Sequence, residues 1–95
     1  MAVYLQILIF FMHDFHLADT IYKTIMNYAA KNNLQKITKA TIELGKIIEH
    51  GEEVLPANLE FNIKLLAEGG IAAGFEVKVI PSDNDHWTLK EIEGE

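Results

Sequence analysis

Apolar side chains recur at three- and four-residue steps in two stretches of the chain, which is the pattern of amphipathic helices. The first stretch runs from Leu17 to about Ala30, with Asp14 as the expected N-cap. The second begins at Pro56, which suits the first turn of a helix, and ends at Gly69. The apolar positions are Leu17, Ala18, Ile21, Tyr22, Ile25, Tyr28 and Ala29 in the first and Leu59, Ile63, Leu66 and Ala67 in the second.

Alternating apolar and polar positions predict three strands, over residues 37–48, 75–81 and 87–93. Gly45 allows a bend or bulge in the first of them. Residues 82–86 read as a short polar turn, so the last two strands are expected to form a hairpin. Two helices with one apolar stripe each would cover one face of a small mixed sheet. We therefore expect a single α+β domain over residues 1–95.

Residues 1–11 form the most apolar stretch of the chain. They are too short for a membrane helix, which needs about 20 apolar residues, and a secretory signal would begin with basic residues, whereas the first lysine is Lys23. The β-branched and aromatic content predicts an extra strand over Val3 to Phe11, which gives the order (β)αβαββ. Alternatively, the native chain begins at Met12 and residues 1–11 are an extension.

Composition narrows the function classes. The 95 residues carry eight basic side chains, all lysine, against 14 acidic ones, for a net charge of −6. Without arginine and with an acidic balance, neither a nucleic acid nor a membrane is expected as a partner. The absence of cysteine excludes disulfides, thiolate zinc sites and a cysteine nucleophile. The nucleophile-elbow and phosphate-loop motifs are also missing, so we do not expect an enzyme.

The clearest candidate chemistry lies at Met12-His13-Asp14-Phe15-His16. Imidazole and carboxylate groups bind nickel, copper and zinc. On a helix, His13 and His16 would lie one turn apart and could share an ion. In an extended segment, a His imidazole and its own deprotonated backbone nitrogen would form the planar chelate that nickel(II) tolerates. The alternative is two surface histidines beside a capping aspartate, because such a pair often occurs by chance.

The other two histidines have simpler explanations. His50 precedes Gly51, Glu52 and Glu53, which read as a solvated acidic loop, although a histidine and two carboxylates could hold a metal weakly. His86 follows Asp83, Asn84 and Asp85 in a turn where Asx hydrogen bonding accounts for the residue types.

A succession of short motifs resembles a known family. The segments are 12–14 (MHD), 38–45 (TKATIELG), 55–61 (LPANLEF), 65–69 (LLAEG) and 77–81 (VKVIP). In order and spacing they are similar to the HypA/HybF hydrogenase nickel-incorporation proteins, from Met12 to about Glu93. No single motif is specific, but their colinear order is.

The resemblance implies a cytoplasmic nickel domain of two helices on a three-stranded sheet. Such a protein delivers nickel to the large subunit of [NiFe]-hydrogenase and works with a GTPase partner. The family's M-H-E start matches Met12, His13 and Asp14, which carries the nickel-ligand role to His13 and its backbone nitrogen. A role for His16 rests on its proximity alone.

Two departures from the family change the expectation. The family carries a cysteine-rich zinc ribbon between its last two strands, where this chain has residues 82–86, so we expect no structural zinc. In the family the methionine amine lies at the nickel site, whereas here Phe11 is joined to Met12 by a peptide bond. A chain that begins at Met1 would therefore bind nickel weakly, or through His16 and Asp14.

The leading hypothesis is a nickel metallochaperone without a zinc ribbon, with Ni(II) held at Met12, His13, Asp14 and His16 and passed on by protein contact. The alternative is a degenerate member of the family that serves as an interaction module, with a homodimer formed through the strand at residues 3–11.

Overall fold

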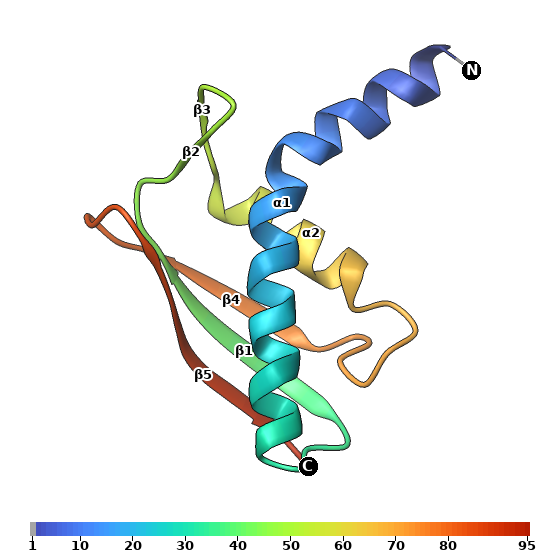
Figure 1. Ribbon diagram of the computed structural model, residues 1–95, viewed down its shortest axis with the longest axis vertical. Coiled ribbons are helices and arrows are strands. Elements are labelled where there is room, and N and C mark those ends of the chain that lie inside the picture. The colour runs from blue at the N-terminus through green and yellow to red at the C-terminus, as the bar shows by residue number, and fades with distance from the viewer. Residues whose placement is uncertain (1) are drawn as a thin grey trace.

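The computed structural model describes the backbone of residues 2–95 and the side chains of residues 16–95. Two helices, α1 (Ala2–Lys31) and α2 (Pro56–Leu66), pack against a three-stranded sheet, and a small hairpin projects beside them (Figure 1). The sheet contains β1 (Ile37–Leu44), β4 (Glu76–Pro81) and β5 (Trp87–Gly94), and the hairpin contains β2 (Ile48–Glu49) and β3 (Glu52–Glu53). The predicted α+β class is confirmed.

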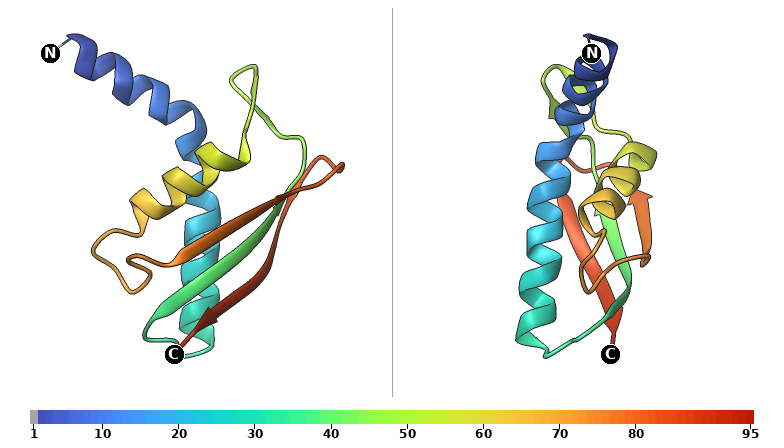
Figure 2. Two further views of the ribbon diagram at one scale, coloured as in Figure 1. Left: turned by 180° about the vertical axis from the view of Figure 1, so that it is seen from behind. Right: turned by 90° about the vertical axis from the view of Figure 1, so that its right-hand side faces the viewer.

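Helix α1 crosses one face of the sheet, and α2 packs beside it along β4 (Figure 2). The amphipathic stripes predicted for the helices supply the core because their spacing puts the apolar side chains on one side. Tyr28 departs from the prediction: it is 48% exposed, and the Lys31 Nζ atom lies 5.4 Å from its ring centroid. The buried helix residues on the predicted stripes are Leu17, Ala18, Ile21, Ile25, Ala29, Leu59, Ile63 and Ala67.

The predicted first strand over residues 3–11 is wrong. These residues belong to the N-terminal part of α1, which is one continuous helix from Ala2 to Lys31. Asp14 therefore lies inside the helix and does not cap it. Asp19, which is also mid-helix, forms an i, i+4 ion pair with Lys23 at 2.9 Å. The end of the helix agrees with the sequence, because Asn33 adopts the left-handed conformation, with φ of 57°.

The predicted hairpin between the last two strands is also wrong. The strand order is β4-β1-β5, in which β1 pairs parallel with β4 and antiparallel with β5. The parallel pairing follows from the crossover through α2 that connects β1 to β4. The polar residues Lys39, Thr41 and Glu43 are half-buried because strands flank β1 on both sides.

Residues 82–86 form the predicted short turn, but the turn passes over the end of β1. The Ser82 N–H donates to the Leu44 carbonyl (2.8 Å), and the Gly45 N–H donates to the His86 carbonyl (2.9 Å). A side chain at position 45 would collide with Asn84 and would lie 2.6 Å from the His86 carbonyl oxygen. Glycine is thus required at position 45 by this close approach, and the first sheet strand ends at Leu44 instead of Ile48.

Helix α2 protects one edge of the sheet. It begins at Pro56, as predicted, and the side chain of Glu60 accepts a hydrogen bond from the backbone N–H of Val79 on β4 (3.2 Å). This carboxylate takes a backbone donor that another strand would otherwise use. Asn62, which lies off the predicted apolar stripe, is nevertheless only 2% exposed.

Candidate metal site

Residues 12–16 lie within helix α1. The side chains of Met12, His13 and Asp14 are outside the described part of the structure, so their predicted roles as ligands stay predictions. His16 is the first residue whose side chain is described, and it is exposed. Its carbonyl accepts a hydrogen bond from the Thr20 hydroxyl (3.1 Å), so its backbone is held in the helix while the imidazole faces solvent.

The helical backbone of residues 12–16 bears on the two chelation modes that the sequence left open. Inside an α-helix, each backbone N–H donates to the carbonyl four residues earlier. A deprotonated nitrogen at His13 would forfeit that hydrogen bond and open the helix. Imidazoles at positions 13 and 16, by contrast, need no change of the backbone, because residues three apart are neighbours on the helix surface. The described backbone of α1 therefore favours ligation through side chains.

The segment around His50, expected to be an acidic loop, is a two-residue hairpin. His50 and Gly51 have φ angles of 52° and 82°, the signature of a type I′ turn. The two flanking strands place Glu49 directly opposite Glu52. Within the described residues, the Glu49 Oε2 atom is buried and lacks a hydrogen-bond partner. His50 thus lies at the tip of a turn whose two strands carry opposed carboxylates.

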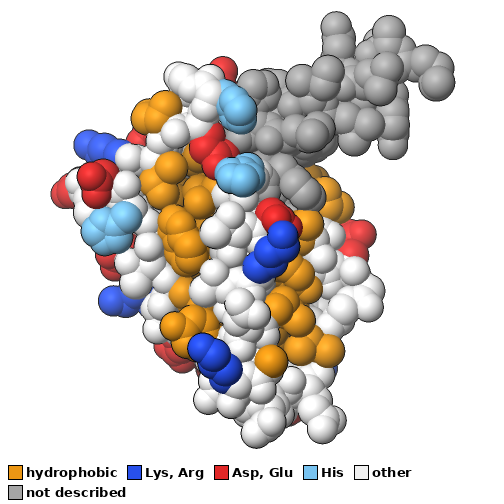
Figure 3. Space-filling model, in the orientation of Figure 1, with side chains coloured by type: hydrophobic (Ala, Val, Ile, Leu, Met, Phe, Trp, Pro, Cys, Tyr) orange, Lys and Arg blue, Asp and Glu red, His pale blue; other side chains and the backbone are white. Residues whose placement is uncertain are grey.

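Histidine side chains gather where the hairpin approaches α1 (Figure 3). The described histidines are His16 on α1, His50 on the hairpin and His86 at the β4–β5 turn. The gathering brings imidazoles from two elements to one end of the molecule. Even so, the described side chains contain no group of three histidine, aspartate or glutamate residues close enough to hold a metal ion.

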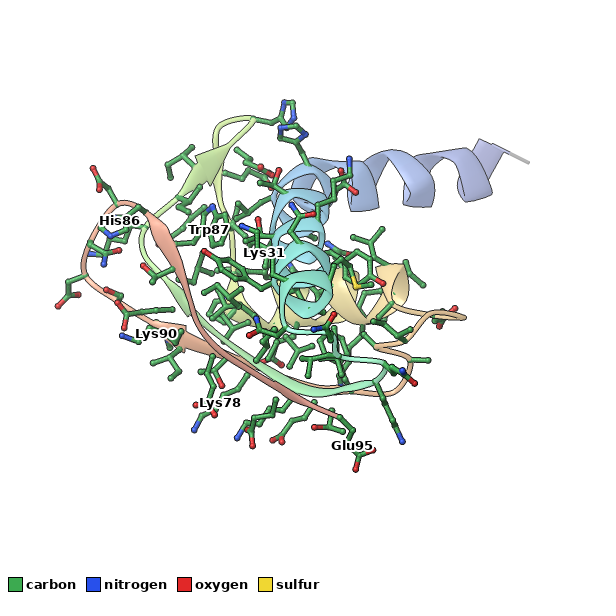
Figure 4. All side chains as sticks on the ribbon, turned by 60° about the horizontal axis from the view of Figure 1, so that its bottom comes forward. Lys31, Lys78, His86, Trp87, Lys90 and Glu95 are labelled. Atoms are coloured by element: carbon green, nitrogen blue, oxygen red, sulfur yellow. The ribbon has the colours of Figure 1, made fainter. Side chains whose placement is uncertain are left out.

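His86 lies elsewhere and is explained by its turn, as predicted. Figure 4 shows it at the start of β5, next to Trp87. Its backbone N–H donates to the Asn84 side-chain oxygen (3.3 Å), which is the expected Asx hydrogen bond. Its Nδ1 atom lies 3.4 Å from a carboxylate oxygen of Asp85.

A cavity at the base of the hairpin is separate from the histidines. It is an open pocket of about 260 Å³ at the start of α2, and its charged lining residues are Lys46, Glu53 and Asp83. Mixed charges at a wide mouth do not select a ligand class.

None of the helices in the described part of the chain is both long and apolar enough to cross a membrane.

The fold and the histidine segment together describe a class of protein, namely a small α+β domain with an exposed histidine on its first helix. No family model matches the chain. Curated proteins match the chain in sequence, and they are named hydrogenase maturation factor HypA. The protein from Thermococcus onnurineus is 30% identical over 91 residues, which cover 87% of this chain and 63% of the relative. The protein from Pyrococcus abyssi is 33% identical over 89 residues, which cover 85% and 61%.

A solved structure shares the fold. The solution structure of the Ni metallochaperone HypA from Helicobacter pylori aligns with a TM-score of 0.66 at 10% identity, over 86% of this chain and 97% of that one. By its relatives and its fold, this chain belongs to the HypA family. The family consists of maturation factors and not of enzymes, in agreement with the sequence-based expectation. The chain spans less than two thirds of the length of the Thermococcus onnurineus and Pyrococcus abyssi proteins.

Proposed function

We propose that this protein is a nickel metallochaperone that holds Ni(II) at the histidines of helix α1 and releases it by protein contact. The observation that carries the proposal is the helical backbone of residues 12–16 with the exposed imidazole of His16. Two imidazoles one helical turn apart are a donor set that suits nickel(II). The solved HypA structure from Helicobacter pylori is described as that of a Ni metallochaperone, which supports nickel as the metal.

The four predicted ligands would not contribute equally on a helix. Positions 13 and 16 are three apart, a spacing that makes residues neighbours on a helix surface, whereas positions 14 and 16 are two apart, a spacing that does not. Met12 is four positions before His16, but its thioether is a soft ligand that suits copper(I) better than nickel(II). We therefore assign the principal roles to His13 and His16, with Asp14 and Met12 as secondary donors.

The client would be the large subunit of [NiFe]-hydrogenase, with a maturation GTPase as the second partner, in the cytoplasm. Support comes from the eight curated relatives, which are all named as hydrogenase maturation factors. In this chain the five residues 82–86 join β4 to β5, and the sequence has no cysteine for a zinc ribbon. Partner contacts through a zinc ribbon between β4 and β5 would then be missing, and no structural zinc is expected there.

The structure removes the argument for the alternative proposal, an interaction module. It depended on residues 3–11 forming a strand that pairs between two chains, and those residues are helical. A dimer formed through such a strand is therefore not proposed. Metal binding and oligomeric state remain separate measurements.

Calorimetric titration of Ni(II) into the full chain tests the proposed function. His13→Ala and His16→Ala should each weaken binding by at least about tenfold, equivalent to about 1.4 kcal/mol. His86→Ala is the matched control, because this histidine lies at a different turn, and it should change nothing. If the wild-type chain does not bind nickel, or if both α1 variants bind as tightly as wild type, the proposal is wrong.

A second chain that begins at Met12 sharpens the test. It would keep every described core residue, since the core begins at Leu17. It would also place a free amine beside His13, and an amine is a better ligand than a peptide nitrogen. We expect tighter nickel binding by this chain than by the full one.

A further inference from the structure

Strand β5 forms one edge of the sheet, because in the described part of the chain it pairs with β1 only (Figure 1). The Glu93 carbonyl faces β1, where it accepts a hydrogen bond from the Thr38 hydroxyl (3.2 Å). The His86 carbonyl, just before β5, accepts a hydrogen bond from the end of β1 in the same way (2.9 Å). Since successive residues of a strand direct their backbone groups to alternate sides, Leu89 and Ile92 direct theirs outward. These two residues therefore offer N–H and C=O groups to an added strand.

A bulge in β5 directs two apolar side chains to the same face of the sheet. Consecutive residues of β1 pair with Glu91 and with Leu89, so Lys90 is an extra residue between them. In a regular strand, side chains three positions apart would point to opposite faces. Because of the extra residue, Leu89 and Ile92 both pack against the hydrophobic core. Lys90 and Glu91 are exposed, so the edge carries an apolar pair and a charged pair.

The sequence of β5 is complementary to itself in one antiparallel register. When Leu89 lies opposite Ile92 of a second copy, Lys90 lies opposite Glu91 of that copy. Opposite side chains must share a face, and the bulge meets this condition for the apolar pair. Two-fold symmetry repeats both pairs, which gives two apolar pairs and two ion pairs. A shift of one residue in either direction would place Lys90 or Glu91 opposite itself, and like charges directly opposite destabilise a strand pair.

Open hollows lie along β5 beside the C-terminal end of α1. One of about 280 Å³ is lined by Tyr28 and Asn32 together with Leu89 and Ile92. A second, of about 440 Å³, shares Asn32 and Ile92 with the first. The Tyr28 ring is 48% exposed, although it lies on the apolar stripe of its helix. Paired strands lie about 4.8 Å apart, so the apolar side chains of an added strand would reach these hollows.

We infer that the edge of β5 binds the same edge of a second copy of this chain, with the two strands antiparallel and Lys90 opposite Glu91. The pairing joins the two three-stranded sheets into one continuous sheet. The assembly stops at two copies, because a two-fold axis uses the same surface on both. The occupant is a second copy because the charged pair and the apolar pair are both complementary to themselves. The inference goes beyond the proposed function and needs no metal.

Sedimentation equilibrium of the full chain without metal, up to millimolar concentrations, tests the inference. We expect the wild-type chain to dimerise. Lys90→Glu and Glu91→Lys should each weaken the dimer at least about tenfold, because each places like charges opposite one another at two symmetric positions. The double variant Lys90→Glu/Glu91→Lys restores opposite charges, so it should dimerise within about threefold of wild type.

Lys78→Glu is the matched control, since Lys78 is exposed on β4 and its substitution changes the net charge by the same amount as Lys90→Glu. It should leave the dimer unchanged. Far-UV circular dichroism checks that every variant is folded, and amide hydrogen exchange should slow at Leu89 and Ile92 as the dimer forms. A wild-type chain that stays monomeric at millimolar concentrations overturns the inference. So does a dimer that Lys90→Glu leaves intact, or one that the double variant fails to restore.

Discussion

The β2–β3 hairpin and the β4–β5 turn each carry a histidine where the chain reverses, but they are attached to the body in opposite ways. The β4–β5 turn is fastened at three points, since the amides of Gly45, Lys46 and Ser82 each pair with a carbonyl across the contact. At the tip of the hairpin, a Cβ atom added to Gly51 would have no atom within 4 Å.

The difference bears on how the backbone of each histidine is held. His86 belongs to a turn whose backbone and side chains are committed to local hydrogen bonds. His50 sits on a turn that is joined to the body at its base, where the Val54 N–H donates to the Ile47 carbonyl (2.8 Å). Binding residues are commonly carried on projecting turns that a rigid scaffold positions. The β4–β5 turn is therefore held against the body of the domain, whereas the hairpin turn projects from it.

The largest expected effect comes from breaking the fastened turn. Gly45→Ala would place a methyl group against Asn84 and the His86 carbonyl, so the turn must move away and lose its hydrogen bonds. We expect the free energy of unfolding to fall by about 3 kcal/mol, measured by urea denaturation. A loss of less than about 0.5 kcal/mol, as for a surface substitution, would show that the turn is not held against the body.

A smaller effect is expected at the corresponding glycine of the hairpin. Gly51→Ala meets no neighbouring atom, so its only cost is the left-handed backbone, with φ of 82°. We expect the same denaturation experiment to show a loss of about 1 kcal/mol. A loss equal to that of Gly45→Ala would abolish the distinction between the two turns.

The smallest effect is a gain. His50→Asn restores the favoured Asn-Gly pair of a type I′ turn and should raise the free energy of unfolding by about 0.5 kcal/mol. His50→Ala, which tolerates the left-handed conformation poorly, should lower it instead. If asparagine also destabilised the protein, the histidine side chain would be contributing to the fold.

The helices were predictable from the sequence because their own side chains define them. The buried residues Ile21, Ile25 and Ala29 lie on the stripe that the spacing predicted, and α2 begins at Pro56. Residues 3–11 were mistaken for a strand because a short apolar run has no periodicity that separates a buried strand from a helix. The continuation into the Leu17 stripe was the signal for a single long helix.

Strand pairing was less predictable than strand positions. The turn at residues 82–86 suggested a local hairpin, but β1 pairs with both neighbours and separates them. That order depends on the crossover through α2 and on the burial of β1 between two strands, which no local pattern records. The Asx hydrogen bond in the turn, by contrast, is local and was predicted from Asn84 and His86.

The candidate site was predictable only in part. His16 was found by its spacing from His13, and the structure shows it exposed. The left-handed conformation of His50 at the tip of the hairpin was not predicted, because the segment was expected to be an acidic loop. The His-Gly pair between two acidic residues was the one local sign of a type I′ turn.

Glu60 hinders the addition of a further strand at one of the two edges of the sheet. Its carboxylate occupies the Val79 amide, and α2 lies along the β4 margin, so an incoming chain cannot add a strand there without displacing the helix. The margin at β5 has no such cover from α2. Any partner that binds this domain by extending its sheet must therefore approach β5, and crowded copies of the protein cannot stack edge to edge into a continuous ribbon.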